Sequence, residues 1–348
     1  MLLNCKCFII PKDVLERFAH DASLPAQSRK AFSDTSSLED SWRKLRSAHT
    51  VATLARSAGA RSAGMTAALA AAPAILVYNC NHTTSLPGTP VANPGSSADA
   101  TAKRAYDLTK SVAEFYKTNF GRNSIDNNGM TLQSSVHYGV NYNNAFWDGS
   151  QMTYGDGDNN IFIDFTASSD VVGHELTHGV TQFTAGLNYT NEAGGLNESI
   201  SDVFGTMFRQ WLKGQDFGQA DWLIGSEIMG PAARQRGFTC LRDMASPGST
   251  HCLAPQPSHY SQYVPGSDPH SSSGIPNYAF YLAAKALGGK SWEKLGKVWY
   301  AALNTPRPAR SMGFRTFAKR TKTAARQLYP ADPAVYAAVL SGWTGVGL

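Results

Sequence analysis

Long hydrophobic runs and dense charge are both missing from this sequence of 348 residues. No apolar run approaches the ~18 residues of a membrane-crossing helix, so we expect no membrane span. Charged residues make up only 16% of the chain and hydrophobic residues 42%. This composition is typical of folded domains with real cores and excludes a largely disordered chain. The length favours two domains or one large domain.

Cysteine is scarce as well, because five scattered residues are too few for a disulfide framework. Cys240 and Cys252 are close enough in sequence to bridge one loop, and whether they do so stays open. Cys5-Lys6-Cys7 is only half of a metal-binding knuckle. The N-terminus lacks the features of a secretory signal, because a lysine interrupts its apolar stretch and no clear cleavage site follows.

The net charge of +5 is spread unevenly, with a strongly basic stretch at residues 289–328. A basic chain can bind nucleic acid. No zinc finger, knuckle or base-stacking motif accompanies this charge, however. We therefore interpret the stretch as one basic helical face and expect no nucleic-acid partner.

Composition also divides the chain into segments. Residues 1–50 are polar with short helical patches, and residues 51–76, rich in Ala, Gly, Ser and Arg, are typical of a flexible connector that can be cleaved. Residues 78–165 mix one helix with several strands. The helix is predicted at 98–120 with Gly121 as its stop, and the strand-like runs are 135–142, 144–147 and 160–165.

Helical periodicity dominates from residue 168 onward. Gly194-Gly195 is expected to act as a break before the second helix of this region. The predicted helices are 169–184, 196–213, 274–287, 291–303, 311–327 and 332–341.

A His-Glu-x-x-His pattern lies inside the predicted helix 169–184. His174 and His178 are four residues apart, so both project from one helix face and can share one Zn²⁺. Glu175 is rotated by about 100°. It is poorly placed to be a third ligand, but it can reach a water held by the metal, which is the position of a general base.

The next predicted helix offers two carboxylates, Glu198 and Asp202, which share one face. Glu198 can complete a His₂Glu zinc site whose fourth position is left for water. Asp202 can accept the spare ring N–H of a zinc-binding histidine. The alternative, that both are solvated or capping residues, explains poorly why they lie on an otherwise apolar helix.

The stretch 174–208 closely resembles the thermolysin-like (M4) metallopeptidases, as do residues 120–126, 144–147, 154–158 and 273–277. The resemblance covers roughly residues 78–348. It implies an α+β fold of two lobes, with the zinc-binding helix between them. The catalytic lobe, with a mixed and β-rich structure, would span residues 66–187, and a mainly helical lobe would span residues 188–348.

The first residues resemble the short prosegment of protealysin-type enzymes, in Cys7-Phe-Ile-Ile-Pro followed by Val14-Leu15. By this resemblance, residues 1–65 would be a prosegment and linker that inhibit the enzyme within the same chain. Steric covering of the cleft is the favoured mode. The alternative is that the Cys7 thiolate occupies the open zinc position.

The resemblance also implies the roles of individual residues. His174, His178 and Glu198 would bind one catalytic Zn²⁺ with Asp202 behind them, and Glu175 would activate the water. Tyr189 and His270 would donate hydrogen bonds to the oxyanion of the tetrahedral intermediate. The substrate would be held along its backbone by Asn144, Ala145 and Arg242, and its residue after the scissile bond would enter an apolar pocket lined by Phe162, Phe165, Val171, Ile224 and Leu241. Plain core packing remains an alternative for Phe162 and Val171, and helix-end packing for Tyr189.

Around His270 the sequence departs from the family pattern. The usual glycines before this histidine are absent, and so is the acid five residues earlier that orients its ring. Asp268 is the available substitute, and its reach to the ring is left open here.

The double calcium site of the family is also altered. Arg209, Leu223 and Ser226 stand where the family has carboxylates, which leaves Asp170 and Asp221. Ca²⁺ needs several hard oxygen ligands, and an arginine among them repels it. Calcium is therefore possible elsewhere but not predicted at the double site, where Arg209 could pair with Asp170 instead.

Together these features predict a zinc-dependent endopeptidase made as a zymogen, monomeric, acting on proteins and peptides. The resemblance implies secretion, although without a visible signal an intracellular precursor or another export route remains an alternative. An aminopeptidase of the same ligand class would need an acidic anchor for the substrate amine, and no such motif is found. A non-catalytic zinc module would leave Glu175 without a role.

Overall fold

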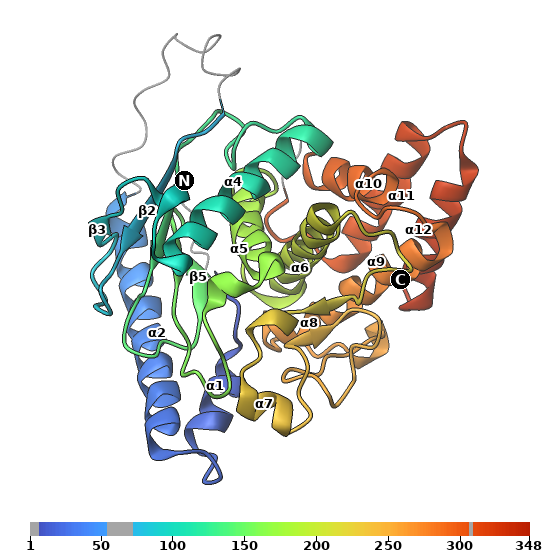
Figure 1. Ribbon diagram of the computed structural model, residues 1–348. Coiled ribbons are helices and arrows are strands. Elements are labelled where there is room, and N and C mark those ends of the chain that lie inside the picture. The colour runs from blue at the N-terminus through green and yellow to red at the C-terminus, as the bar shows by residue number, and fades with distance from the viewer. Residues whose placement is uncertain (1–6, 54–71, 306–308) are drawn as a thin grey trace.

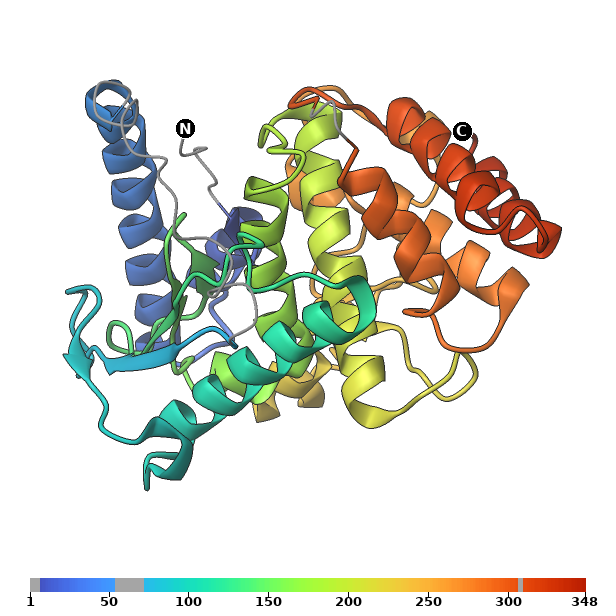
Figure 2. The same ribbon diagram turned by 90° about the horizontal axis from the view of Figure 1, so that it is seen from above.

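The protein is described from a computed structural model that places residues 7–53, 72–305 and 309–348. A strand-containing N-terminal lobe lies beside a helical C-terminal lobe, and helices α5 (Ser169–Gln182) and α6 (Asn191–Lys213) run through the middle of the molecule (Figures 1 and 2). This arrangement confirms the predicted α+β fold of two lobes. Within the described ranges, no helix is long and apolar enough to cross a membrane.

Six short strands form the sheet of the N-terminal lobe, in the order β1-β5-β6-β4-β2-β3. β2, β4 and β6 are parallel neighbours, whereas β1 pairs antiparallel with β5. The strands are β1 Cys7–Phe8, β2 Ile75–Asn79, β3 Thr89–Pro90, β4 Leu132–Val136, β5 Ala145–Trp147 and β6 Met152–Tyr154. The first described residues of the chain therefore extend a sheet whose other strands come after residue 74.

Helix α4 (Ala100–Phe120) confirms the helix predicted at 98–120. The Asp99 side chain accepts hydrogen bonds from the backbone N–H groups of Thr101 and Ala102, which caps the start of the helix. Gly121 ends it with a left-handed backbone, φ +66°, a conformation that glycine adopts without steric cost.

The predicted strand at 135–142 is only partly right, because β4 stops at Val136. His137 and Gly139 have positive φ angles of +54° and +68°, which are incompatible with a continuing strand. The short run 144–147 is confirmed as β5.

The strand predicted at 160–165 is wrong. The Asp158 carboxylate accepts hydrogen bonds from the backbone N–H groups of Ile161 and Phe162, and this folds the run into a turn. A single bridge between Phe162 and Met229 is the strand-like pairing that remains in the described structure. Continuous hydrophobicity in this run reflects burial and not sheet pairing, which periodicity cannot distinguish.

The break expected at Gly194-Gly195 is also wrong, because both glycines lie inside α6. They are needed for close packing against α8 (Pro269–Ser272). A Cβ atom at Gly195 would lie 2.3 Å from the Ser272 Oγ, and one at Gly194 would lie 2.9 Å from the Pro269 Cγ. The glycines therefore bring His270 of α8 close to the middle of the molecule.

The helices of the C-terminal lobe agree with the predictions to within a few residues at their ends, and α9 and α12 pack side by side (Figure 1). They are α9 Gly274–Leu287, α10 Lys294–Leu303, α11 Phe314–Leu328 and α12 Pro333–Gly345. The shorter elements are η1 Pro94–Ser96, η2 Phe165–Ala167, β7 Leu223–Ile224, η3 Ser226–Ile228, α7 Pro231–Gln235, β8 Arg242–Asp243, η4 Tyr260–Gln262 and α8 Pro269–Ser272.

The N-terminal segment, defined here as residues 7–53, contains β1, α1 (Lys12–Ala19) and α2 (Ala26–Thr53). Only short helical patches were predicted for residues 1–50, but α2 is a helix of 28 residues that enters the expected connector. Most of that connector, residues 54–71, lies outside the described residues. The polar sequence of α2 gives little amphipathic signal, and packing against the rest of the protein stabilises such a helix.

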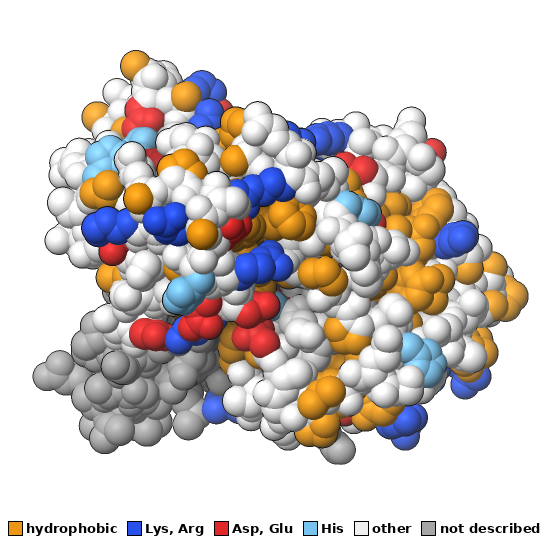
Figure 3. All heavy atoms as spheres, turned by 90° about the horizontal axis from the view of Figure 1, so that it is seen from below, with side chains coloured by type: hydrophobic (Ala, Val, Ile, Leu, Met, Phe, Trp, Pro, Cys, Tyr) orange, Lys and Arg blue, Asp and Glu red, His pale blue; other side chains and the backbone are white. Residues whose placement is uncertain are grey.

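The N-terminal segment contacts both lobes. The Phe32 ring lies 5.1 Å from Phe18 and 6.0 Å from Phe162 of the N-terminal lobe, measured between ring centroids. Arg17 donates a 2.7 Å hydrogen bond to the Leu253 carbonyl, and Arg236 is paired with Asp21 at 2.6 Å. Viewed from below, basic and acidic side chains are interspersed on the surface (Figure 3).

Candidate active site

Close packing of α5 on α6 brings the predicted zinc ligands together. A Cβ atom at Gly205 would lie 2.6 Å from the Asp170 carbonyl oxygen and 2.9 Å from the His174 backbone nitrogen. Glycine at this position lets the two helix backbones approach closely. As a result, Glu198 of α6 faces the two histidines of α5.

Three side chains converge in this buried place. The Nε2 atoms of His174 and His178 are 3.0 Å apart, and the Glu198 carboxylate oxygens lie 3.4 Å and 3.5 Å from them. All three side chains are at most 1% exposed. The Glu198 Oε2 atom has no hydrogen-bond partner in the described structure. Two imidazoles and a carboxylate, dry and aimed at one point, fit the donor set of a catalytic zinc site.

A hydrogen bond from its second ring nitrogen holds the His174 ring in place. Asp202 accepts a 2.8 Å hydrogen bond from the His174 Nδ1, as predicted from its spacing. Arg242 in turn donates to both carboxylate oxygens of Asp202, at 2.7 Å and 3.0 Å, and Asn277 donates to one of them at 2.8 Å. Asp202 thus joins a histidine predicted to bind zinc to an arginine predicted to bind substrate.

The partners of His178 were missed by sequence reasoning. Its Nδ1 lies 3.0 Å from the Asn197 Oδ1 and 3.0 Å from the Ser201 Oγ. With the Nδ1 proton donated to Asn197, the Nε2 lone pair is left for a metal. The available signal was their spacing, since Asn197 and Ser201 flank Glu198 and are themselves four residues apart.

Burial and neighbouring charges shift the pKa values of His174 and His178 in opposite directions. Burial lowers the pKa of His178 to about 3, so this ring is neutral. Burial also acts against protonation of His174, but its hydrogen bonds to Asp202 and Glu198 dominate and raise its pKa to about 10. A metal ion bound by these ligands would replace that proton.

Glu175 lies beside the ligand cluster and has one unused oxygen. Its Oε2 accepts a 3.0 Å hydrogen bond from the backbone N–H of Trp147, whereas its buried Oε1 has no hydrogen-bond partner in the described structure. Burial raises the pKa of this carboxyl to about 8. The geometry therefore leaves a single basic oxygen free to accept a proton.

His270, Tyr189 and Glu198 also meet at the site. Asp268 does reach the His270 ring, since its Oδ1 lies 2.7 Å from the Nδ1, and it also caps the start of α8. The Tyr189 hydroxyl donates to the Glu198 Oε1 and lies 3.4 Å from the His270 Nε2. Two donors, a phenol and an imidazole, therefore stand at the same side of the ligand cluster.

The predicted substrate-binding residues contact the N-terminal segment. Ile9 donates from its backbone N–H to the Ala145 carbonyl at 3.1 Å and accepts from Arg242 at 3.2 Å. Asn144 both accepts from the Ile10 N–H at 2.9 Å and donates to the Ile10 carbonyl at 3.1 Å. These contacts extend the β1–β5 pairing, so the segment lies as an added strand on the edge that would bind a substrate.

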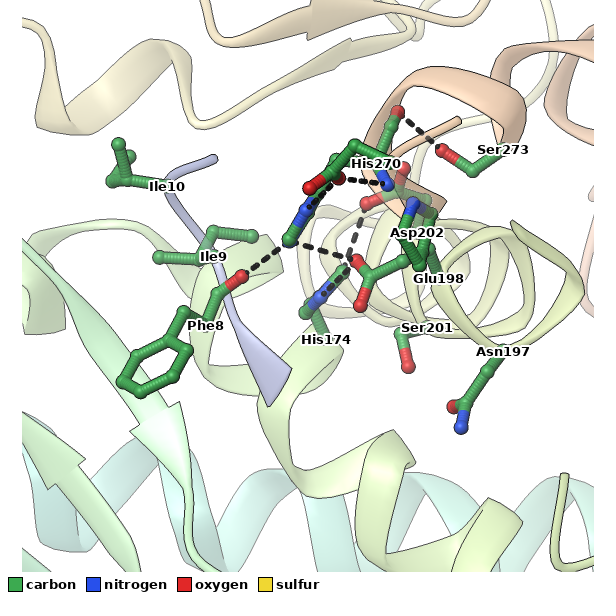
Figure 4. Close-up of polar contacts among 12 residues, drawn as sticks. Phe8, Ile9, Ile10, His174, Asn197, Glu198, Ser201, Asp202, His270 and Ser273 are labelled. Carbon is green, nitrogen blue, oxygen red and sulfur yellow. Dashed lines mark hydrogen bonds and ion pairs between the residues drawn. The ribbon is translucent and has the colours of Figure 1, made fainter. Parts of the chain in front are cut away.

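The next carbonyl along this strand points at His270. The Phe8 carbonyl oxygen lies 2.5 Å from the His270 Nε2, and the Phe8 ring is directed away from the ligand cluster (Figure 4). Glu39 of α2 adds a 2.6 Å contact to the Asn144 amide.

The predicted pocket residues are all fully or almost fully buried and share one contiguous core with Ile9. The rings of Phe162 and Phe165 are tilted by 50° with a centroid distance of 5.5 Å, and Phe162 also contacts Phe32 of the N-terminal segment. The other three are Val171, Ile224 and Leu241. Their burial is compatible with a pocket that Ile9 fills and with plain core packing.

Arg209 contacts the two acidic residues, Asp170 and Asp221, that the resemblance assigned to the calcium site. Its Nη1 is 3.2 Å from the Asp170 Oδ2 and 3.2 Å from the Ser226 Oγ, and its Nη2 pairs with Asp221. The buried guanidinium of Arg209 is therefore paired with both remaining acidic residues. The pair with Asp170 is the one anticipated from the sequence.

Two questions about cysteines were left open by the sequence: whether the Cys7 thiolate occupies the open zinc position, and whether Cys240 and Cys252 form a bridge. The sulfur of Cys7 lies within 4.8 Å of ligand atoms of His178 and Glu198. Cys7 is disulfide-bonded, and a disulfide sulfur carries no thiolate charge, so in this form it offers no thiolate to a metal at the ligand cluster. Cys240 and Cys252 are free thiols whose sulfurs are 3.0 Å apart.

Comparison with protein families matches residues 47–182 to the thermolysin metallopeptidase catalytic domain and residues 185–348 to the thermolysin metallopeptidase alpha-helical domain. The chain belongs to the thermolysin-like (M4) metallopeptidases. As an M4 metalloendopeptidase it is neither an aminopeptidase nor a non-catalytic zinc module, and the family implies zinc as its metal.

Individual relatives agree with this membership. The chain is 42% identical over 283 residues to the extracellular metalloprotease of Pectobacterium carotovorum subsp. carotovorum, which covers 78% of this chain and 80% of the relative. It is 41% identical over 285 residues to protease PrtS of a Photorhabdus species, with coverages of 78% and 76%. The solved structure of the protealysin precursor from Serratia proteamaculans matches with a TM-score of 0.81 and 37% identity, over 98% of this chain and 99% of that one.

Asp202→Asn should weaken zinc binding by about 10–100-fold, the usual effect of losing a hydrogen-bond partner of a zinc ligand. Asparagine keeps the shape and one oxygen that accepts a hydrogen bond from Arg242, whereas alanine would remove both acceptor oxygens. Competition with a chelator measures the affinity, with Asp332→Asn in an exposed ion pair as the matched control. Unchanged zinc affinity in Asp202→Asn would show that this contact does not support the metal.

Proposed function

We propose that this chain is the latent precursor of a secreted, monomeric zinc endopeptidase that prefers a bulky apolar residue directly after the scissile bond. Residues 1–65 would be the inhibitory prosegment and linker, residues 66–187 the catalytic lobe and residues 188–348 the helical lobe. Secretion is proposed because the Pectobacterium relative is named an extracellular metalloprotease.

The chemistry follows from the side chains around the ligand cluster. Held by His174, His178 and Glu198, Zn²⁺ would supply a Lewis acid that polarises the substrate carbonyl and lowers the pKa of water. The free Oε1 of Glu175 accepts the proton released when water attacks and passes it to the leaving amine. Both donors, Tyr189 and His270, stabilise the negative oxygen that develops on the attacked carbonyl.

A single observation carries the proposal of latency and specificity: the backbone of residues 8–10 engages the groups predicted to bind substrate. His270 holds the Phe8 carbonyl, whereas Ala145 and Arg242 hold the N–H and carbonyl of Ile9. In this frame the Phe8–Ile9 peptide stands for a scissile bond. Ile9 then stands for the residue that follows it, which supports a preference for an apolar side chain there.

Specificity is tested with peptides that carry Leu or Asp directly after one defined scissile bond. Burial of a leucine side chain contributes about 1.5–3 kcal/mol, so kcat/KM of the trimmed enzyme should favour Leu by roughly 10–100-fold. Placing the same Leu and Asp pair four residues before the scissile bond is the control and should change kcat/KM little. Equal rates for Leu and Asp after the bond would contradict the assigned pocket.

A further inference from the structure

A second group of metal-binding side chains lies at the carboxyl edge of the sheet, outside the candidate active site. His82 comes three residues after β2, His137 directly follows β4, and Asp156 comes two residues after β6. These strands are parallel neighbours in the sheet. The carboxyl ends of parallel strands meet at one edge, so three segments distant in sequence converge there.

The ligand atoms of this group are close enough to share one ion. The His137 Nδ1 lies 2.8 Å from one Asp156 oxygen, and the His82 Nδ1 lies 3.3 Å from the other. One ligand atom from each residue falls within 4.8 Å of the other two. Two imidazole nitrogens and a carboxylate oxygen suit Zn²⁺ and other divalent transition metals, whereas Ca²⁺ and Mg²⁺ prefer oxygen alone.

Asp99 provides the support that a metal-bound histidine needs. Its Oδ2 lies 3.0 Å from the His137 Nε2, so a ring that binds a metal through Nδ1 would donate its other N–H to this carboxylate. The Oδ1 of Asp99 is fixed as the cap of α4. The carboxylate–histidine pair is therefore anchored on a helix as well as on the sheet edge.

The backbone holds both histidines in a costly conformation. His82 and His137 have left-handed φ angles of +58° and +54°, which are unfavourable for residues other than glycine. The His82 N–H donates to the His137 carbonyl at 2.9 Å, which ties the two loops together. Left-handed histidines joined in this way are placed by the surrounding structure, and both rings are directed to Asp156.

The group is open to solvent on one side. The His82 side chain is 58% exposed, whereas those of His137 and Asp156 are 19% and 21% exposed. Hydrogen bonds to Asp156 and Asp99 raise the pKa of His137 to about 9 despite its burial. A metal therefore competes with one proton on this ring, and binding is best measured in mildly alkaline solution.

We propose that His82, His137 and Asp156 form a second metal site, which binds a divalent transition-metal ion and is separate from the predicted catalytic zinc. Asp99 acts as the positioning residue of His137, and water completes the coordination on the exposed side. The ion joins the loops that follow β2, β4 and β6, so its expected effect is on the stability of this edge and not on the chemistry.

Calorimetric titration of the full chain with Zn²⁺ at pH 8, after one equivalent has been bound, tests this proposal. We expect a second equivalent to bind. His82→Ala should weaken that second binding by at least about 100-fold, and Asp99→Asn, which keeps the helix cap, should weaken it by about 10–100-fold. His20→Ala, at an exposed histidine of the N-terminal segment, should bind as the parent does.

Thermal unfolding gives a second measurement. Excess Zn²⁺ should raise the melting temperature of the parent chain and of His20→Ala more than that of His82→Ala, because a ligand that binds only the folded state stabilises it. His82 is exposed, so its replacement should leave the fold intact. A titration that ends at one equivalent, or a second equivalent that His82→Ala retains, would overturn the proposal.

Discussion

Glu175→Gln should abolish peptide hydrolysis in the trimmed enzyme while leaving its fold and its zinc content unchanged. Glutamine is nearly isosteric, and its oxygen can still accept the hydrogen bond from the Trp147 N–H that the Glu175 Oε2 accepts. Its amide nitrogen takes the place of the free Oε1 and cannot accept a proton. Because a general base contributes about 10²–10⁴-fold to a rate, kcat should fall by at least that factor.

Steady-state hydrolysis of a small peptide, together with zinc analysis of the same sample, measures both parts of this expectation. Glu192→Gln is the matched control, since Glu192 lies on the neighbouring helix α6 and contacts Tyr260 and the Phe314 backbone instead of the ligand cluster. The control should keep kcat within a few-fold of the parent. A Glu175→Gln enzyme with near-normal kcat would refute the assigned base.

The full chain, with its connector made resistant to cleavage, should hydrolyse a small peptide at least about 100-fold more slowly than the trimmed enzyme. The N-terminal segment occupies the edge strand β5, His270 and Arg242, and its tether gives it a high effective concentration. Comparison of kcat/KM for the two forms is the measurement. Equal turnover would mean that the segment leaves the site when substrate is present.

A point substitution in the uncleaved chain tests whether latency comes from the N-terminal segment covering the site or from another effect of the uncut connector. Phe32→Ala removes a buried ring that packs between Phe18 and Phe162, a loss of about 3–5 kcal/mol. This variant should regain part of the activity without cleavage. Lys30→Ala, on the exposed face of the same helix, is the control and should stay latent. Equal latency of both variants would show that α2 packing does not hold the cover in place.

Much of the candidate site was predictable because it depends on helical spacing. His174 and His178 share a face of α5 for the same geometric reason that places Glu198 and Asp202 on one face of α6. The substitution of Arg209 for an acidic residue also predicted its pairing with Asp170, since opposite charges at a buried position must meet. In these cases the side-chain type and its local spacing determine the contact.

Other parts of the site depend on which elements pack together. The contacts of Asn197 and Ser201 to His178 require the crossing of α5 and α6, and the contact of Asn277 to Asp202 requires α9 beside α6. Gly194 and Gly195 were interpreted as a break, because their need for space is visible only once α8 lies against α6. Spacing along one helix carries no information about the neighbour that it meets.

By itself, the sequence determined the helices with strong periodicity, the zinc-binding pattern and the family, because these depend on residues near each other in the chain. Tertiary structure alone decided that residues 8–10 pair with β5, that the 160–165 run forms a turn, and that His82, His137 and Asp156 meet at one sheet edge. Each of these depends on contacts between segments far apart in sequence. Their stability comes from burial and backbone hydrogen bonds that exist only after the chain has folded.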